Sequence, residues 1–297
     1  MMHLRVGTRG SDLALWQSRW VVEQLRIAHP SLSVEEIVIK THGDIAADQR
    51  IDADWPVGGF VGAIEEALVA GRIDFAVHSY KDLPTQTTPG LTIAAVPSRE
   101  LVNDVLVTHA TVDLGHLPRG FRLGTSSQRR AAQFSRLCRD IQIVPIRGNV
   151  PTRIAKIGRD NLDGVVLAAA GLKRLGIDPP HRIDLPTDRF VPSPAQGALA
   201  VQTRVNCAAA ELIKVLDDDK ARRAVDAERS FLQAIGAGCH TPVGALATIH
   251  GAKISMHGQL FSDDHRRVAE GVEAGEDSET VGRRLALRLI GELKKHT

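Results

Sequence analysis

The sequence predicts an α/β protein with two similar domains, followed by a small α+β domain. Short β-prone runs alternate with helical segments, and this strand–helix–strand rhythm occurs twice in succession, over roughly a hundred residues each time. Three more β-prone runs and a last helix follow. Hydrophobic residues make up 43% of the 297 residues but aromatic residues only 4%, so we expect aliphatic cores, as in layered α/β proteins.

The first domain is predicted to comprise residues 1–97 and 198–217. Its expected strands lie at residues 4–7, 34–40, 73–77 and 91–96, and its expected helices at 13–27 and 60–70. Ser11 or Asp12 is a natural cap for the first helix. The alternation favours a parallel sheet with crossover helices. The polar stretch 41–59 is expected to form a flap or lid.

The second domain is predicted to comprise residues 103–192. Its expected strands lie at residues 105–107, 121–123, 141–146 and 165–168, and its expected helices at 127–137, 150–158 and near Leu172. Connectors are expected at residues 97–103 and 192–194. If residues 198–202 form a strand that returns to the first domain, these connectors are two hinge segments between the domains.

Residues 220–297 are predicted to form the third, α+β domain. A helix at 220–235 precedes a glycine-rich break at 236–242. The β-prone runs at 243–249, 253–261 and 268–272 and the helix at 279–294 follow.

Composition excludes several function classes. The formal net charge of +2 gives no whole-molecule argument for binding nucleic acid or membranes. Positive charge gathers between Arg119 and Arg182, where thirteen Lys or Arg stand against four Asp, so this segment is expected to face an anionic partner or acidic surfaces elsewhere. Three scattered cysteines are too few for a disulfide framework or a zinc site. Without an apolar signal or membrane-spanning run, we expect a cytoplasmic protein.

The polar stretch at residues 78–84 follows the predicted strand at 73–77 and ends at Pro84. In open α/β sheets, ligands bind at the carboxyl ends of parallel strands. Lys81 and Asp82 would supply one cation and one carboxylate there. Position alone also fits a solvated loop at the end of a strand.

Arginines follow other predicted strands. Residues 124–130 join a strand end to a helix start, with hydroxyls at Thr125 and Ser127 and guanidiniums at Arg129 and Arg130. Residues 147–153 repeat this design, and Arg9 stands at the equivalent turn of the first domain. Arginine suits bidentate carboxylate binding, so the set indicates a ligand with several carboxylates or phosphates. Each site alone also fits a capped helix with exposed arginines.

Cys239 lies in a glycine-flanked loop, where a thiolate would be exposed and nucleophilic. A small buried hydrophobe is the alternative for Cys239, and it is the expected role of Cys138 and Cys207. The twelve histidines show no paired spacing of metal ligands, so no metal site is predicted.

Together these stretches resemble one family, the porphobilinogen deaminases, also called hydroxymethylbilane synthases. The matching motifs occur in family order between residues 6 and 244. They are residues 8–11, 13–17, 78–84, 124–127 with 129–130, 147–150 with 153, 169–176, 196–198, 227–229 and 238–239.

The resemblance implies three domains, of which the first two look like a periplasmic-binding-protein (type II) pair and the third carries a cofactor. It implies a transferase of tetrapyrrole (haem) biosynthesis that joins four porphobilinogen molecules head to tail, each losing ammonia. The chain would grow on a dipyrromethane cofactor attached to Cys239 by a thioether, and water would release hydroxymethylbilane. It also implies a monomer with porphobilinogen as its small-molecule partner, without nucleic acid or membrane.

The resemblance assigns the catalytic role to Asp82, which would stabilise the positive charge left when ammonia departs and would manage the protons. Such acid–base help is worth ~10²–10⁴ in rate. The cofactor-binding positions it implies are Cys239 (covalent), Lys81, Ser79, Thr125, Ser127, Arg129, Arg130, Arg147 and Gly148. The substrate-binding positions it implies are Arg9, Ser11, Arg147, Arg153, Arg174 and Gln196.

The chain departs from the family pattern at two positions. Val57 and Gly62 stand where the family often has lysines. The contacts between a lid and the substrate would therefore differ from those in the family pattern. Two other functions fit parts of the pattern. A solute-binding protein for a polycarboxylate leaves Cys239 and Asp82 without a role. A nucleic-acid binder is disfavoured because arginines and aromatic residues do not interleave in the basic segment.

Overall fold

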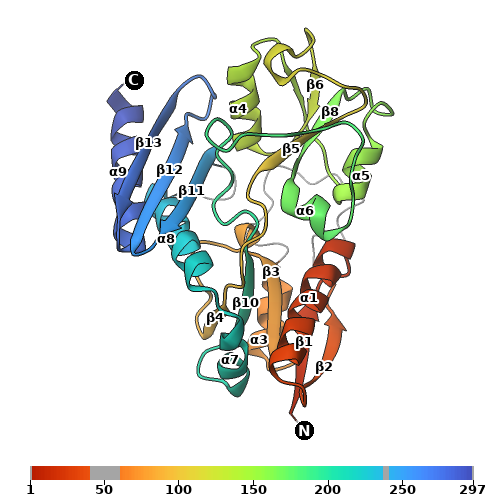
Figure 1. The fold of residues 1–297 in the computed structure, drawn as a ribbon, viewed down its shortest axis with the longest axis vertical. Coiled ribbons are helices and arrows are strands. Elements are labelled where there is room, and N and C mark those ends of the chain that lie inside the picture. The colour runs from red at the N-terminus through yellow and green to blue at the C-terminus, as the bar shows by residue number, and fades with distance from the viewer. Residues whose placement is uncertain (1, 41–60, 237–240, 296–297) are drawn as a thin grey trace. The chain divides into compact units, whose positions relative to one another are not determined.

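The computed structural model describes residues 2–40, 61–236 and 241–295. The chain divides into two compact units, residues 1–100 with 198–222 and residues 101–197 with 223–297. The first unit holds one five-stranded sheet, and the second holds a five-stranded and a three-stranded sheet (Figure 1). The predicted flap at 41–59, with Val57, and the predicted cofactor cysteine, Cys239, lie outside the described residues.

The sheet of the first unit has the strand order β2-β1-β3-β10-β4. Its strands are β1 (His3–Thr8), β2 (Ser33–Val38), β3 (Phe75–Ser79), β4 (Leu91–Ala95) and β10 (Leu199–Arg204). β1 runs parallel to β2 and β3, whereas β10 runs antiparallel to β3 and β4. The predicted return of the chain near residue 198 is confirmed. The predicted parallel arrangement holds for β1, β2, β3 and β4, which run in one direction, and the returning strand β10 departs from it by running antiparallel between β3 and β4.

Helices cover both faces of this sheet. They are α1 (Asp12–Ala28), α3 (Gly62–Val69) and α7 (Ala208–Ile213), with the 3-10 turns η2 (Tyr80–Asp82) and η4 (Lys214–Leu216). Successive side chains of a strand point to opposite faces. Accordingly, Phe75 and Val77 belong to the core that α1 covers, whereas Ala76 belongs to the core that α3 covers.

The five-stranded sheet of the second unit has the order β7-β6-β8-β5-β9. Its elements are β5 (Asp104–Thr108), η3 (Leu114–His116), β6 (Arg122–Gly124), α4 (Gln128–Leu137), β7 (Gln142–Val144), α5 (Val150–Ala155), β8 (Gly164–Ala168), α6 (Ala169–Arg174) and β9 (Arg182–Asp184). Strand β6 is parallel to β7 and β8, and β5 is antiparallel to β8, which repeats the plan of the first sheet. The repeat confirms the expectation of two similar α/β domains.

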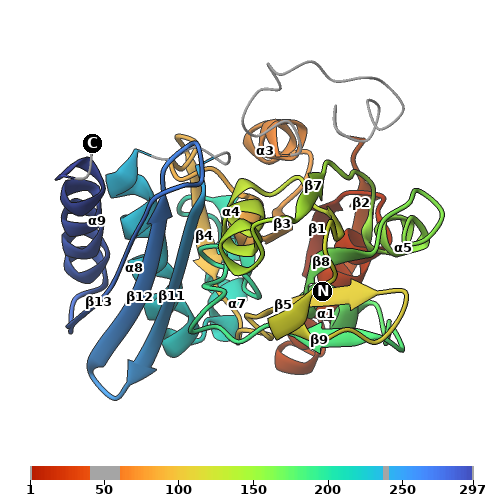
Figure 2. The same ribbon diagram turned by 90° about the horizontal axis from the view of Figure 1, so that it is seen from above.

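The C-terminal part forms an antiparallel sheet of β11 (Val243–His250), β12 (Lys253–Phe261) and β13 (Val268–Gly275). Helices α8 (Asp219–Ile235) and α9 (Ser278–Lys295) pack on this sheet (Figure 2). The shared core contains Phe231 of α8, Met256 of β12 and Leu285 of α9. The predicted small α+β part is confirmed, while the domain boundaries 1–97 with 198–217, 103–192 and 220–297 stay a prediction.

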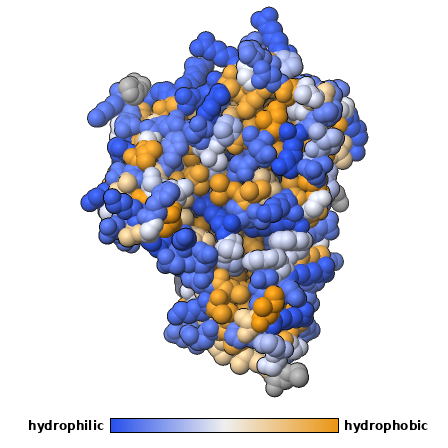
Figure 3. Space-filling model, viewed as in Figure 1, coloured by the Kyte–Doolittle hydropathy of each residue, from blue (hydrophilic) through white to orange (hydrophobic). Residues whose placement is uncertain are grey.

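The surface is predominantly polar on the face shown in Figure 3, where apolar residues lie in scattered patches. Among the described residues, no helix combines the length and the apolar character that crossing a membrane requires.

Candidate active site

The predicted catalytic loop begins later than the sequence indicates. Strand β3 continues to Ser79, because β10 pairs with it from Leu199, opposite Ser79, onward. Residues 78 and 79, which the sequence predicts to lie in a loop, belong to the strand because of this pairing. The 3-10 turn η2 follows, with its last backbone bond from Leu83 N to Tyr80 O at 3.2 Å.

Asp82 lies at the end of η2 with an exposed side chain, and Lys81 beside it is half-buried. The turn is anchored in the first unit. Tyr80 and Leu83 are buried, with 4% and 5% of their surface exposed, and the Tyr80 N–H donates to Ala198 O at 3.0 Å. A carboxylate thus stands on a firmly held turn at the carboxyl end of a parallel strand, where ligands bind in such sheets.

His78, which the sequence left unassigned, points to the other face of β3. It is buried, and its Nε2 lies 3.1 Å from Gln202 Oε1. Gln202 in turn donates to Glu65 of α3 at 2.8 Å. Burial lowers the pKa of His78 from 6.5 to about 4, while the bond to Gln202 acts in the opposite direction. His78 is therefore a neutral core residue.

Arg9 and Ser11 lie where β1 leads into α1. Ser11 is the N-cap, and its hydroxyl oxygen accepts from Ala14 N at 3.4 Å. Capping uses a lone pair of the hydroxyl and leaves its hydrogen to donate. Arg9 is half-buried. Both predicted substrate-binding side chains thus belong to the first unit, as do Ser79, Lys81 and Asp82.

The predicted anion site at residues 124–130 has the expected strand–turn–helix form. Ser127 is the N-cap of α4, and its Oγ accepts from Arg130 N at 3.4 Å. Thr125 is buried, and its hydroxyl oxygen accepts from Ser127 N at 3.1 Å. The start of this ten-residue helix therefore combines two hydroxyls with the positive end of a helix dipole.

Arg129 and Arg130 are buried rather than exposed, at 5% and 7%. Arg129 Nη2 donates to Asp104 Oδ2 at 2.8 Å, and Arg130 Nη2 to Asp104 Oδ1 at 2.6 Å. Burial lowers the pKa of Arg129, Asp104 opposes this effect, and the charge of Arg130 adds to it. Two guanidiniums thus share one carboxylate, which leaves an excess of positive charge in the interior.

Arg147, Gly148 and Arg153 lie around the start of α5. Arg147 is exposed, and within the described residues no ion pair is recorded for it. Gly148 has φ +110, and a Cβ there would lie 2.7 Å from Thr152 Cγ2, so only glycine fits. Arg153 Nε donates to Gly148 O at 2.7 Å. These residues form one structured turn after β7.

Arg174 and Gln196 are both buried in the second unit. Arg174 Nη2 donates to Gly197 O at 2.7 Å. Gln196 is fully buried and donates to Val102 O at 2.8 Å and to Asp104 Oδ1 at 3.0 Å. Their substrate-binding role stays a prediction, and both also brace the chain beside the Asp104 cluster.

Comparison with known proteins decides the family. The description "Porphobilinogen deaminase, dipyromethane cofactor binding domain" matches residues 4–211, and "Porphobilinogen deaminase, C-terminal domain" matches residues 222–291. The chain belongs to the porphobilinogen deaminase family. The porphobilinogen deaminase of Roseiflexus sp. strain RS-1 is 45% identical over 285 residues, covering 96% of this chain and 94% of the relative. That of Lachnospira eligens is 45% identical over 294 residues, covering 98% and 99%.

Among solved structures, the methionine-binding protein MetQ has a TM-score of 0.45 to this chain at 11% identity, over 74% of this chain and 92% of that one.

The described residues suit the anionic dipyrromethane cofactor of the porphobilinogen deaminase family. Within the described chain, Arg130 Nε is buried without a hydrogen-bond partner. Such an orphaned donor costs about 1–3 kcal/mol, which a carboxylate would relieve. Arg129 and Arg130 together carry one more positive charge than Asp104 neutralises. With the unpaired Arg130 donor, this charge makes the interior of the second unit favourable for an acidic ligand.

Two supporting residues, Asp104 and Gln17, were not predicted from the sequence. Asp104 opens the buried strand β5 and precedes three apolar residues, a pattern that indicates a paired carboxylate. Gln17 shares the buried stripe of α1 with Val21 and Leu25 at i, i+4 spacing, so its amide is a polar group in a core position. Its partner is Ser79, whose Oγ lies 2.8 Å from Gln17 Nε2.

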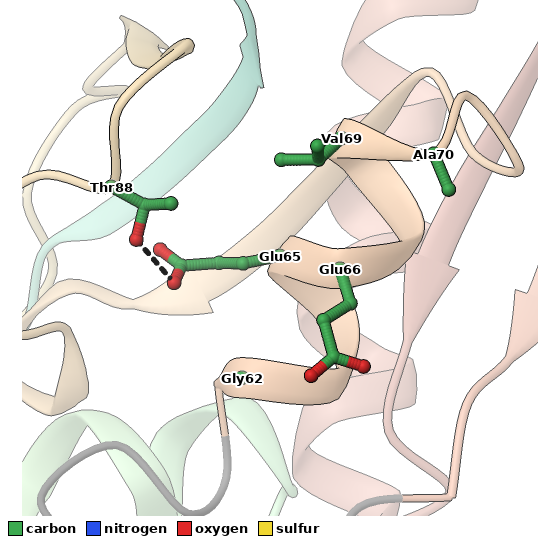
Figure 4. A pocket seen from close by; sticks show the side chains of 6 residues that line it. All are labelled: Gly62, Glu65, Glu66, Val69, Ala70 and Thr88. Atoms are coloured by element: carbon green, nitrogen blue, oxygen red, sulfur yellow. Dashed lines mark hydrogen bonds between the residues drawn. The ribbon is translucent and has the colours of Figure 1, made fainter.

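A pocket of about 390 Å³ opens beside α3, away from these residues. Glu65 turns toward Thr88 in Figure 4, and the Thr88 hydroxyl donates to Glu65 Oε2 at 2.7 Å. Gly62, one of the departures from the family pattern, also lines it. The pocket contains none of the predicted site residues. Among the described His, Cys, Asp and Glu side chains, no group of three is placed to hold a metal ion.

Proposed function

We propose that this protein is a porphobilinogen deaminase (hydroxymethylbilane synthase) that joins four porphobilinogen molecules head to tail and releases hydroxymethylbilane. The observation that carries this proposal is the match of both family domains, which together span residues 4–211 and 222–291. The buried positive charge of the second unit and the exposed carboxylate of Asp82 supply the two chemical functions that the reaction needs.

Each condensation forms one carbon–carbon bond, breaks one carbon–nitrogen bond and releases one ammonia. When bound through Cys239, the dipyrromethane supplies the pyrrole carbon to which the first substrate is joined. Asp82 balances the positive charge that develops on the substrate as ammonia leaves, because a fixed carboxylate favours a nearby cation. Asp82 then accepts the proton released from the pyrrole carbon.

Carboxylates on the pyrroles are held by cations and hydroxyls. We assign the cofactor to Lys81, Ser79, Thr125, Ser127, Arg130, Arg147 and Gly148. Arg129 acts with them through Asp104, because its Nη donors already reach Asp104, Gln133 and Val191. We assign the incoming substrate to Arg9, Ser11, Arg147, Arg153, Arg174 and Gln196.

The covalent cofactor is tested by the mass of the intact, denatured protein. We expect freshly purified active protein to carry an added mass equal to two pyrrole units, and Cys239→Ser to lack it. Cys207→Ser is the matched control, because Cys207 is a half-buried cysteine remote from the predicted cofactor loop in the sequence. An unmodified mass in active wild-type protein would contradict the proposal.

The catalytic carboxylate is tested by Asp82→Asn. This change keeps the size of the side chain and one acceptor oxygen but removes the charge and the proton-accepting oxygen, so we expect turnover of porphobilinogen to fall by about 10²-fold or more. The folded state and the added mass should remain. Asp140→Asn, which removes an exposed carboxylate paired with Arg119, is the control and should keep normal turnover. Near-normal turnover in Asp82→Asn would show that another group does the work.

We also propose that the enzyme acts as a monomer in the cytoplasm without nucleic-acid or membrane partners. The near-neutral net charge of +2 gives no general attraction to nucleic acid or anionic membranes, and three scattered cysteines fit a reducing compartment. Light scattering at micromolar concentration should give one chain, and a dimer mass would refute the monomer.

A further inference from the structure

Ser79 lies on the face of β3 that α1 covers. Phe75 and Val77 of this strand pack in the same core as Val21 and Leu25 of α1. Because side chains alternate along a strand, Ser79 continues this row, while His78 points to the opposite face. The row is apolar until the strand ends, and there it changes to a hydroxyl.

Gln17 meets that hydroxyl from the helix side. It is 3% exposed and lies one turn before Val21 on the buried stripe of α1. An amide in such a place destabilises a core unless it forms hydrogen bonds. Its Nε2 donates to Ser79 Oγ at 2.8 Å, across a sequence separation of 62 residues.

The direction of this bond determines what Ser79 can do. A serine hydroxyl has one hydrogen to donate and lone pairs to accept with. Because the lone pair faces Gln17, the hydrogen remains for another acceptor, and in the described part of the chain none is recorded for it. Ser79 is half-buried and immediately precedes the turn that carries Lys81 and Asp82.

We propose that Gln17 is a positioning residue that orients the Ser79 hydroxyl as a hydrogen-bond donor toward a carboxylate of the bound pyrrole chain. This role rests on the proposed function. Gln17 itself touches no ligand; it holds one serine in the donor direction. A carboxylate accepts such a bond strongly, because bonds to charged groups are stronger than neutral ones.

The test compares thermal midpoints of full-length protein with and without the cofactor, the latter as Cys239→Ala. The cofactor should raise the thermal midpoint, and this rise is the midpoint difference. Gln17→Met keeps the side-chain length without hydrogen bonding, so we expect it to reduce the midpoint difference by about 2 °C or more. A purely structural role would lower both midpoints equally. In a Ser79→Ala background, Gln17→Met should cause no further loss of the difference, because its target is gone.

Gln24→Met is the matched control on the same helix, where Gln24 is half-buried, and it should leave the difference unchanged. The proposal would be overturned if Gln17→Met reduced the midpoint difference by the same amount in the wild-type and Ser79→Ala backgrounds, or did not reduce it at all. A larger difference in Gln17→Met would also overturn it, because Ser79 would then have been donating to Gln17.

If Gln17→Met does not fold, Gln17→Asn stays polar but is one methylene too short to reach Ser79, and the same comparison applies. If the masses of wild type and Cys239→Ala differ only by the substitution itself and their midpoints are equal, the proposed function itself fails and this inference falls with it. If wild type carries the added mass and Cys239→Ala does not, while Gln17→Met leaves the difference in thermal midpoint intact, only the inference fails.

Discussion

Buried charge at Asp104 sets the electrostatics of the predicted anion site. The carboxylate is 1% exposed and accepts from Arg129, Arg130 and Gln196. Removing one partner of a buried ion pair usually costs much more than the pair contributes, because the remaining charge has no counter-charge. The excess guanidinium is tolerated here because neighbouring carbonyls of Val166 and Val191 also accept from these arginines.

His78 makes stability depend on pH in a defined direction. Its pKa of about 4 in the folded protein lies below the ordinary 6.5, so the folded state binds fewer protons than the unfolded state between these values. The contribution of His78 to the free energy of unfolding, about 3 kcal/mol, is complete above pH 6.5 and is lost as the pH falls toward 4. We expect His78→Gln to flatten the pH dependence of thermal unfolding in that window.

The exposed His250 provides the control for replacing a histidine as such. If His78→Gln and His250→Gln show the same pH dependence as wild type, His78 is not the group responsible.

At the level of elements, α8 and α9 approach so closely that only glycine fits between them. A Cβ at Gly282 of α9 would collide with the backbone oxygen of Ala227 and would lie 2.7 Å from Phe231 N. Gly291 of the same helix has open space around it. The two positions separate packing from helix propensity.

We expect Gly282→Ala to lower the free energy of unfolding by about 1–3 kcal/mol, because the helices must move apart. Gly291→Ala should instead raise it by up to about 1 kcal/mol, because alanine favours a helix over glycine. Chemical denaturation of the two variants measures both effects. Stabilisation by Gly282→Ala would show that the helices adjust without cost.

At the level of the whole molecule, the reaction requires many carboxylates to be held as the product grows. Arg147 is exposed at the start of α5, and among the described residues no ion pair is recorded for it, so its guanidinium remains for a ligand. Arg119 is also exposed but pairs with Asp140.

We expect Arg147→Leu to reduce turnover roughly ten- to a hundredfold, since a charged hydrogen bond to the growing chain is lost. Intact-protein mass spectrometry during turnover should show incomplete chains accumulating on the protein. Arg119→Leu should behave as wild type. Unchanged product formation in Arg147→Leu would place this arginine outside the reaction.

Much of the fold and of the candidate site could be predicted locally. Ser127 and Asn149 cap the helices that the sequence indicated, and the strand at 165–168 is found as β8 at Gly164–Ala168. Capping residues and apolar runs act within a few residues, so their effect is readable along the chain. The motif residues, and with them the family, were also identifiable without coordinates.

Only the tertiary structure decided where the motif side chains point. Strand β3 reaches Ser79 because β10, some 120 residues later, supplies its hydrogen-bond partners. Arg129 and Arg130 are buried because Asp104 lies 25 and 26 residues before them in the chain and beside them in space. Burial and pairing depend on residues brought together by folding, so sequence determined which groups are present, and packing determined which of them are buried in pairs and which stay exposed.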